Sequence, residues 1–201
     1  TITSNANKAI DIIGSDGLTA KVKLVDATIY GPNVSVAVTG NTQSTTPYPA
    51  IFEMVGGATT QTVLPQGYGA ELIVSGGTLT GVAPIQGNGS TGNGGTKITI
   101  GGTAVIDGDD SVAIYHPQNG ELIINGGTIT GTNAIEMKAG KLVVTGGTIT
   151  GTGPFVATPP ATGSSSTDTG DAILIYNMGG YTGNLSADIS GGTITSTNGY
   201  A

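Results

Sequence analysis

The chain has 201 residues, of which 36 are Gly, 37% are hydrophobic and only 9% are charged, with a formal net charge of −7. Six basic residues against 13 acidic ones argue against nucleic acid as a partner, because phosphate binding needs clusters of Lys and Arg. The absence of Cys excludes disulfides, zinc–thiolate sites and Cys nucleophiles, and no apolar run approaches the ~20 residues of a membrane span, so membrane insertion is not expected.

One phrase occurs five times along the chain: Gly-Gly-Thr followed by a short β-branched or aliphatic run. It begins at Gly76, Gly101, Gly126, Gly146 and Gly191. Such a self-repeat is typical of a solenoid, in which each repeat is one coil that buries its apolar side chains against its neighbours. Aromatic residues make up only 4% of the chain. We therefore expect an all-β solenoid with a thin, layered core of Ile, Val and Leu.

Aligned on this phrase, the chain resolves into about six coils of three short strands. The first strands begin, in chain order, at Ala9, Ala50, Ala83, Ala113, Ala134 and Ala172. The second strands are predicted at 22–24, 72–74, 98–100, 122–124, 142–144 and 187–189. The third strands are predicted at 28–30, 78–80, 103–105, 128–130, 148–150 and 193–195. Because side chains alternate between the two faces of a strand, the middle residue of each third strand is expected to point inward.

Four segments interrupt this rhythm and are interpreted as loop insertions, near 31–49, 55–70, 87–96 and 152–170. We interpret residues 1–201 as a single domain and as a piece of a longer protein, because the opening Thr-Ile-Thr-Ser of 1–4 recurs at 193–196. The same similarity suggests self-association through the solenoid ends, since open ends expose strand edges.

The repeated Gly-Gly-Thr-Ile-Thr-Gly phrase, clearest from Asp107 to Gly151, resembles the right-handed parallel β-helix superfamily. That superfamily includes pectate lyases, polygalacturonases and the pectate-lyase-like adhesive domains of bacterial or viral surface proteins. The resemblance implies a right-handed, single-stranded parallel β-helix. It also implies an extracellular, cell-surface or virion setting, and it says little about activity.

One acidic segment bears on catalysis. Gly108-Asp109-Asp110 resembles the Gly-Asp-Asp phrase of polygalacturonases, in which paired carboxylates act as acid and base. The Gly-His-Gly and Arg-containing phrases of that family are missing; the chain has no Arg, and its single His, His116, lies in a predicted strand. We therefore expect no catalytic residues, and a polysaccharide lyase or hydrolase is an alternative.

The same segment is a candidate metal site. Asp107, Asp109 and Asp110 could ligate Ca²⁺, a hard cation that takes carboxylate and carbonyl oxygens. The competing interpretation is a solvated acidic turn, because Asp-Gly-Asp-Asp is ordinary turn chemistry. No other cofactor is expected.

Outward positions on the first strands predict a binding surface. Alternation away from inward Ile residues places four side chains on one exposed ladder: Phe52, Tyr115, Glu136 and Tyr176. Rings and carboxylates on a flat surface suit sugar rings, by apolar stacking and by hydrogen bonds to hydroxyls. β-propensity alone would also place Tyr and Phe in strands. These four are the candidate carbohydrate-binding residues.

A second outward column runs along the second strands and is apolar in its middle: Lys23, Ile73, Thr99, Ile123, Val143 and Asp188. An apolar face of this kind predicts cover by a loop or by a partner chain. The outward Thr pairs of the third strands form an array of the kind found on ice-binding solenoids, broken at Tyr30 and Val105.

Together these features predict a non-enzymatic, extracellular structural or adhesive module of a surface or filament protein, with a polysaccharide or glycan as its partner. The alternative from a different class is a self-assembling fibre subunit or virion spike that stacks end to end.

Overall fold

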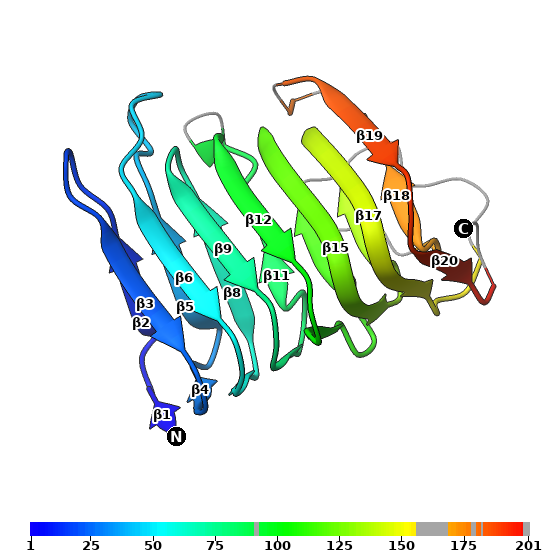
Figure 1. The fold of residues 1–201 in the computed structure, drawn as a ribbon, viewed down its shortest axis with the longest axis horizontal. Coiled ribbons are helices and arrows are strands. Elements are labelled where there is room, and N and C mark those ends of the chain that lie inside the picture. The colour runs from blue at the N-terminus through cyan, green and yellow to red at the C-terminus, as the bar shows by residue number, and fades with distance from the viewer. Residues whose placement is uncertain (91–92, 156–168, 178–179, 182, 199–201) are drawn as a thin grey trace.

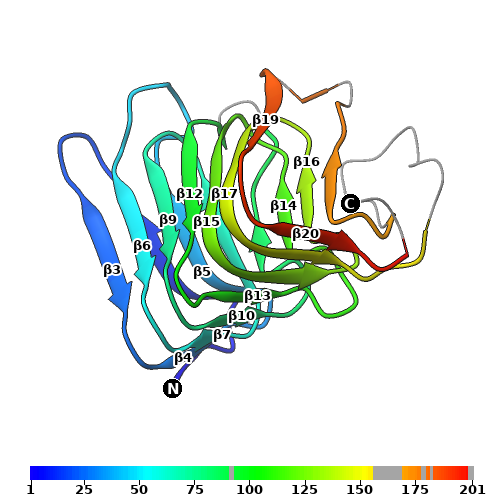
Figure 2. The ribbon, with the colours of Figure 1, turned by 45° about the vertical axis from the view of Figure 1, so that its right-hand side comes forward.

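A computed structural model describes residues 1–90, 93–155, 169–177, 180–181 and 183–198. Within these ranges the chain is all-β, and its strands pair in parallel to form two sheets, one of 13 strands and one of 7 (Figure 1). The sheets curl around a shared interior in a solenoid-like arrangement (Figure 2). No helix in the described ranges is long and apolar enough to cross a membrane.

The smaller sheet, sheet B, collects the first strands of the repeats. It consists of β2 (Lys8–Ile13), β5 (Val34–Thr39), β8 (Thr62–Gln66), β11 (Ile85–Gln86), β14 (Ile114–His116), β16 (Ile135–Met137) and β18 (Ile173–Ile175).

The larger sheet, sheet A, contains two columns of strands. The column of second strands holds β3 (Ala20–Leu24), β6 (Ala50–Met54), β9 (Ala70–Val74), β12 (Thr96–Ile100) and β19 (Leu185–Ile189). The column of third strands holds β1 (Ile2–Thr3), β4 (Thr28–Tyr30), β7 (Ala58–Thr59), β10 (Thr78–Thr80), β13 (Val105–Asp107) and β20 (Thr193–Ser196). Two long strands, β15 (Gly120–Gly131) and β17 (Gly140–Gly151), run through both columns and so join them into one sheet.

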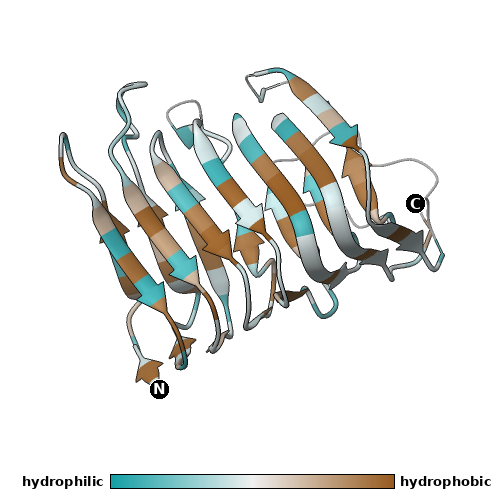
Figure 3. Cartoon of the chain, viewed as in Figure 1, coloured by the Kyte–Doolittle hydropathy of each residue, from teal (hydrophilic) through white to brown (hydrophobic). Residues whose placement is uncertain are grey.

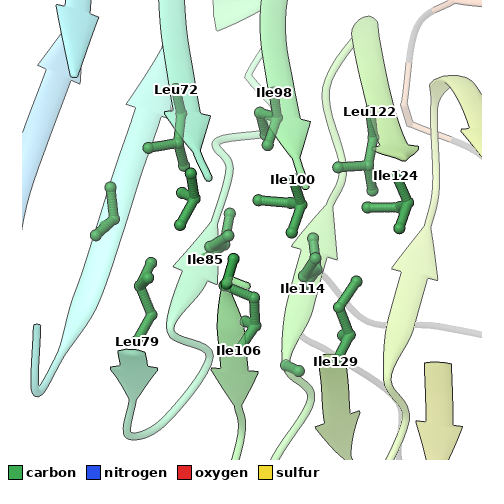
Figure 4. Close-up of a cluster of buried hydrophobic side chains, with 14 of the residues drawn as sticks. Leu72, Leu79, Ile85, Ile98, Ile100, Ile106, Ile114, Leu122, Ile124 and Ile129 are labelled. Atoms are coloured by element: carbon green, nitrogen blue, oxygen red, sulfur yellow. The ribbon is translucent and has the colours of Figure 1, made fainter. Parts of the chain in front are cut away.

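The core fills the space between the columns with stacked aliphatic side chains (Figure 4). In the second column Leu72, Ile98 and Leu122 follow one another in register, and each is fully buried. The first and third columns repeat this pattern with Ile114 and Ile129 facing the same interior. Each such side chain contributes about 1.5–3 kcal/mol by leaving water. The predicted thin core of Ile, Val and Leu is therefore confirmed.

The Gly-Gly pair of the repeated phrase forms the corner between the second and third strands. Gly127 has a φ of +80°, which glycine adopts without strain. A Cβ placed on it would lie 2.8 Å from the carbonyl oxygen of Ala104 in the neighbouring repeat. The phrase thus recurs because both the dihedral angle and the close approach of the next strand require glycine.

The predicted strand alignment was wrong between residues 31 and 70. The supposed insertion at 31–49 contains β5, and the one at 55–70 contains β7 and β8. The segment from Ala50 was predicted to be a first strand, but it is β6 of the second column, paired with β3 and β9. Sheet B accordingly has seven strands where six first strands were predicted. The predicted alignment had therefore treated strands β5 to β7 and strands β8 to β10, which are two coils, as a single coil.

A variant of the repeated phrase explains this error. Gly56-Gly57-Ala58-Thr59 carries Ala where the other copies carry Thr, and its inward position is held by Thr59, which is fully buried. Because a polar residue takes the inward position, this copy of the phrase was not recognised in the sequence.

A second shift affects the segment at 103–105. The third strand here is β13, which begins at Val105, and its inward residue is Ile106 in register with Leu79 and Ile129. Two extra residues after Gly102 therefore lengthen the corner. The predicted insertion at 87–96 overlaps the start of β12 at Thr96, and residues 156–168 of the predicted loop at 152–170 lie outside the described residues.

The two ends of the described chain occupy the same column. Ile2 of β1 pairs with Ile29, and Ile194 of β20 pairs with Ile149. The predicted equivalence of segments 1–4 and 193–196 is therefore confirmed as an equivalence of position in the fold.

Candidate functional site on the outer face of sheet B

Three of the four predicted carbohydrate-binding residues lie close together at sheet B: two on adjacent strands, and Tyr176 directly after the end of β18. Tyr115 of β14 is in register with Glu136 of β16. The backbone N–H of Tyr176 donates to the carbonyl oxygen of Met137 at 2.9 Å, which places Tyr176 beside the strand that carries Glu136. Because Ile114 and Met137 belong to the core, alternation directs Tyr115 and Glu136 to the outer face.

The fourth residue, Phe52, was wrongly predicted to point outward. It lies in β6, in register with Val22 and Leu72, and its side chain is fully buried in the core. The error follows from the misaligned repeat, since moving the segment to another column also exchanges its inward and outward faces.

Two further residues complete the cluster on the outer face. The ammonium of Lys138 lies 3.2 Å from Oε1 of Glu136, 5.0 Å from the ring centroid of Tyr115 and 5.6 Å from that of Tyr181. The hydroxyls of Tyr115 and Tyr181 are 3.0 Å apart. A cation held against two ring faces and a carboxylate fixes the orientation of all four groups. We call Tyr115, Glu136, Lys138, Tyr176 and Tyr181 the tyrosine cluster.

Sequence reasoning missed Lys138 and Tyr181 for different reasons. Lys138 was readable, because it follows Glu136 by two residues and so shares its face. Tyr181 follows β18 in a segment without strand periodicity, and its approach to Tyr115 depends on the path of the chain between β18 and β19.

Burial divides the tyrosine cluster into a base and a rim. Tyr115, Glu136 and Lys138 are each less than 5% exposed, so they do not form the exposed ladder that was predicted. Tyr115 also packs against Val112 and Ala83 on the outer side of the sheet. Tyr176 and Tyr181 are half-buried and present the accessible part of the cluster.

The buried part of the tyrosine cluster holds Tyr115 in its neutral form. Burial raises the pKa of Tyr115, and its hydrogen bond with Tyr181 and the nearby charge of Glu136 act in the same direction. Tyr115 is therefore held as a neutral hydrogen-bonding group. The Lys138–Glu136 pair satisfies charge within the protein, as buried ions require.

The single histidine faces the core and stands apart from the cluster. His116 of β14 is fully buried, and its Nδ1 donates to the carbonyl oxygen of Ala139 at 3.1 Å. Its Nε2 has no hydrogen-bond partner among the described residues. Burial lowers the pKa of His116 to about 4, so the ring is neutral at physiological pH.

The acidic segment at 107–110 forms a turn at the end of β13. The backbone N–H of Asp109 donates to Oδ1 of Asp107 at 3.1 Å, and Asp109 has a φ of +51°. The side chains of Asp109 and Asp110 are exposed. Across the part of the chain that the structure describes, no three Asp, Glu or His side chains converge as a metal site would require. This geometry matches the turn interpretation of the segment.

A small polar hollow of about 130 Å³ lies close to the cluster, between Tyr68, Ser90, Gln118 and Asn119. Gly89 lines it and also packs against the ring of Tyr181.

Comparison of the chain with family models, with curated proteins and with solved structures finds no match.

Proposed function

We propose that the chain is a right-handed parallel β-helix that acts as a non-enzymatic structural and adhesive module of an extracellular surface or filament protein, with a polysaccharide as its ligand. The observation that carries this proposal is the tyrosine cluster. Residues from β14, from β16 and the position after it, and from positions 176 and 181 after β18 meet there on one outer face.

The division of the cluster into base and rim suits sugar recognition. The half-buried rings of Tyr176 and Tyr181 supply apolar faces on which a pyranose can stack, and their hydroxyls supply hydrogen bonds. Beneath them, the Lys138–Glu136 pair and the ring of Tyr115 hold Tyr181 in place before a ligand arrives. A preorganised surface binds more tightly because less side-chain entropy is lost on binding.

The test is retention on insoluble polysaccharides by the parent chain and by Tyr176→Ala and Tyr181→Ala. We expect each variant to bind about three- to tenfold more weakly, because a stacked ring contributes on the order of 1 kcal/mol. Tyr30→Ala is the matched control, since Tyr30 is 40% exposed but lies on β4, far from the cluster. Equal retention by all four proteins would remove the tyrosine cluster from the proposal.

The second candidate function, end-to-end assembly into a fibre or virion spike, is favoured by the outermost strands. Ile2 is in register with buried Ile29, and Ile175 with buried Met137, yet Ile2 and Ile175 are 42% and 44% exposed. Among the described strands, β2 and β3 at one end and β18 and β19 at the other pair on one side only. Such edges can pair with another copy. Light scattering tests this: a mass that grows beyond a dimer with concentration supports assembly, and a constant mass contradicts it.

A further inference from the structure

The outer face of the second-strand column carries two rows of side chains in register across four strands. The first row, on β9, β12, β15 and β17, alternates in charge: Glu71, Lys97, Glu121 and Lys141. The second row, two residues further along the same strands, is uncharged: Ile73, Thr99, Ile123 and Val143. We call these eight residues the striped face.

No other element of the described chain is drawn in front of these strands in Figure 1. In Figure 3 these strands lie nearest the viewer, and their ribbons carry bands of hydrophilic and hydrophobic residues. Lys97 and Lys141 are exposed, and the remaining six residues are half-buried by their neighbours. The second row is therefore a strip of β-branched side chains that the described part of the fold leaves uncovered.

Most charges of the first row are not paired within the described chain. Lys141 pairs with Asp188 at 2.7 Å, whereas Glu71, Lys97 and Glu121 form no ion pair among the described residues. The charges at the other end of the column differ, because Glu53 pairs there with both Lys21 and Lys23. The middle of the striped face thus keeps its charges available to a partner.

The pattern is complementary to itself under one particular symmetry. A two-fold axis that lies along the strand direction, midway between β12 and β15, reverses the order of the strands and keeps each row opposite the same row. Lys97 then faces Glu121 of the second copy, and Glu71 faces Lys141 of the second copy. Every charge in the row meets its opposite, and each such contact occurs twice, as an isologous interface requires.

The uncharged row obeys the same operation. Thr99 faces Ile123 of the second copy, and Ile73 faces Val143. A two-fold axis along the stack would instead place the charged row over the uncharged one and bury charges without partners, which is costly. The sequence pattern therefore favours one of the two face-to-face arrangements.

We propose that the striped face is a docking surface for a second copy of this chain, which forms a closed, two-fold symmetric dimer with the strips in contact. Strands about 4.8 Å apart with five residues each give the four strands of the striped face an area of about 19 Å by 17 Å. About 300 Å² per partner lies below the range of stable interfaces, so the dimer is expected to be weak and transient, with a dissociation constant towards the millimolar range. Complementary charges set its register, and salt weakens it.

Sedimentation equilibrium of the parent chain from micromolar to millimolar concentration tests the proposal. We expect a reversible monomer–dimer equilibrium that weakens between low and high salt. Lys97→Glu places like charges opposite Glu121 of the partner, and we expect at least a tenfold loss of association. Lys8→Glu is the matched control: it makes the same change of charge on β2 of sheet B and should associate as the parent does.

A charge swap gives the sharper test. The double variant Lys97→Glu with Glu121→Lys restores opposite charges across the proposed two-fold axis, so association should recover relative to Lys97→Glu alone. Circular dichroism of each variant verifies that the fold is retained. A monomer at every concentration, or a double variant no better than the single one, would overturn the proposal. Growth beyond a dimer that Lys97→Glu does not alter would also overturn it, and would assign association to the strand edges at the ends.

Discussion

Two regions of this molecule build the same three columns from very different sequences. Residues 120–151 repeat their phrase almost letter for letter in β15 and β17, and the two strands pair over nearly their whole length. Residues 34–66 supply β5, β6, β7 and β8 to the same columns without a clean copy of the phrase. The comparison teaches that the fold constrains the inward positions and the corners, and leaves the rest of the repeat free to vary.

If the fold constrains the inward positions alike in both regions, truncating a buried side chain should lower the free energy of unfolding by a similar amount in each region. Phe52→Ala in the irregular region and Leu122→Ala in the regular one each remove a fully buried side chain. We expect losses of about 3–5 and 2–5 kcal/mol in the free energy of unfolding, respectively. Urea denaturation followed by circular dichroism measures both. A loss below about 1 kcal/mol for Phe52→Ala would mean that β6 does not pack into the shared core.

Acidification should act on His116, whose ring faces the core on β14, next to the regular region. The pKa of His116 is about 4 in the folded chain and about 6.5 in an unfolded one. The unfolded state therefore takes up the proton first, and stability falls as the pH drops from about 6.5 to about 4, by about 3 kcal/mol from this residue.

The variant His116→Gln isolates this effect. It keeps an N–H donor for the carbonyl of Ala139 and cannot titrate, so its stability should change less across that pH range than the parent's. Parallel pH profiles for the two proteins would show that the His116 ring is not protonated selectively on unfolding.

The corners can be tested with two glycines of similar φ and different surroundings. Gly127→Ala should cost about 2 kcal/mol or more, because a strained φ is combined with close contact to the Ala104 carbonyl. Gly17 also has a positive φ, but no atom of the described residues lies within 4 Å of the position that a Cβ would take, so Gly17→Ala should cost less. Thermal melts compare the two variants directly. Equal shifts in melting temperature would mean that the contact with the Ala104 carbonyl does not add to the cost of Gly127→Ala.

Replacing the polar residue that hid the irregular repeat should stabilise the chain. Thr59 is fully buried, and within the described part of the chain its hydroxyl has no hydrogen-bond partner. Thr59→Val keeps the shape and removes the unpaired group, for an expected gain of about 1 kcal/mol. Ile29, its neighbour in register, shows that an aliphatic side chain is accommodated in this column. A destabilised Thr59→Val would indicate that the hydroxyl has a partner after all.

The local sequence was sufficient to assign strands to the three columns wherever glycine and aliphatic residues kept their spacing. The all-β, solenoid-like architecture and most of the second and third strands followed from that spacing alone, whereas the parallel pairing was implied by the family resemblance. The tyrosine cluster was predicted in part, because Tyr115 and Glu136 lie on adjacent strands whose register the repeat defines.

Other features depend on contacts that no local pattern encodes. The burial of Tyr115 and the position of Tyr181 depend on how the chain crosses the outer face of sheet B. Phe52 shows the reverse problem, since strand propensity does not decide its face and only the correct column does.

The placement of β6 beside β9 is the central claim, because it creates the second set of strands and moves Phe52 into the core. An engineered Cys pair tests it in a chain that has no other Cys: Glu53→Cys with Ile73→Cys, which are in register on the same face. Neighbouring strands bring such pairs within disulfide reach, and Thr99→Cys with Ile123→Cys is the control pair in the regular region. We predict that both pairs form intramolecular disulfides on mild oxidation, as mass spectrometry can establish. A control pair that cross-links while the Glu53→Cys and Ile73→Cys pair stays reduced would contradict the account.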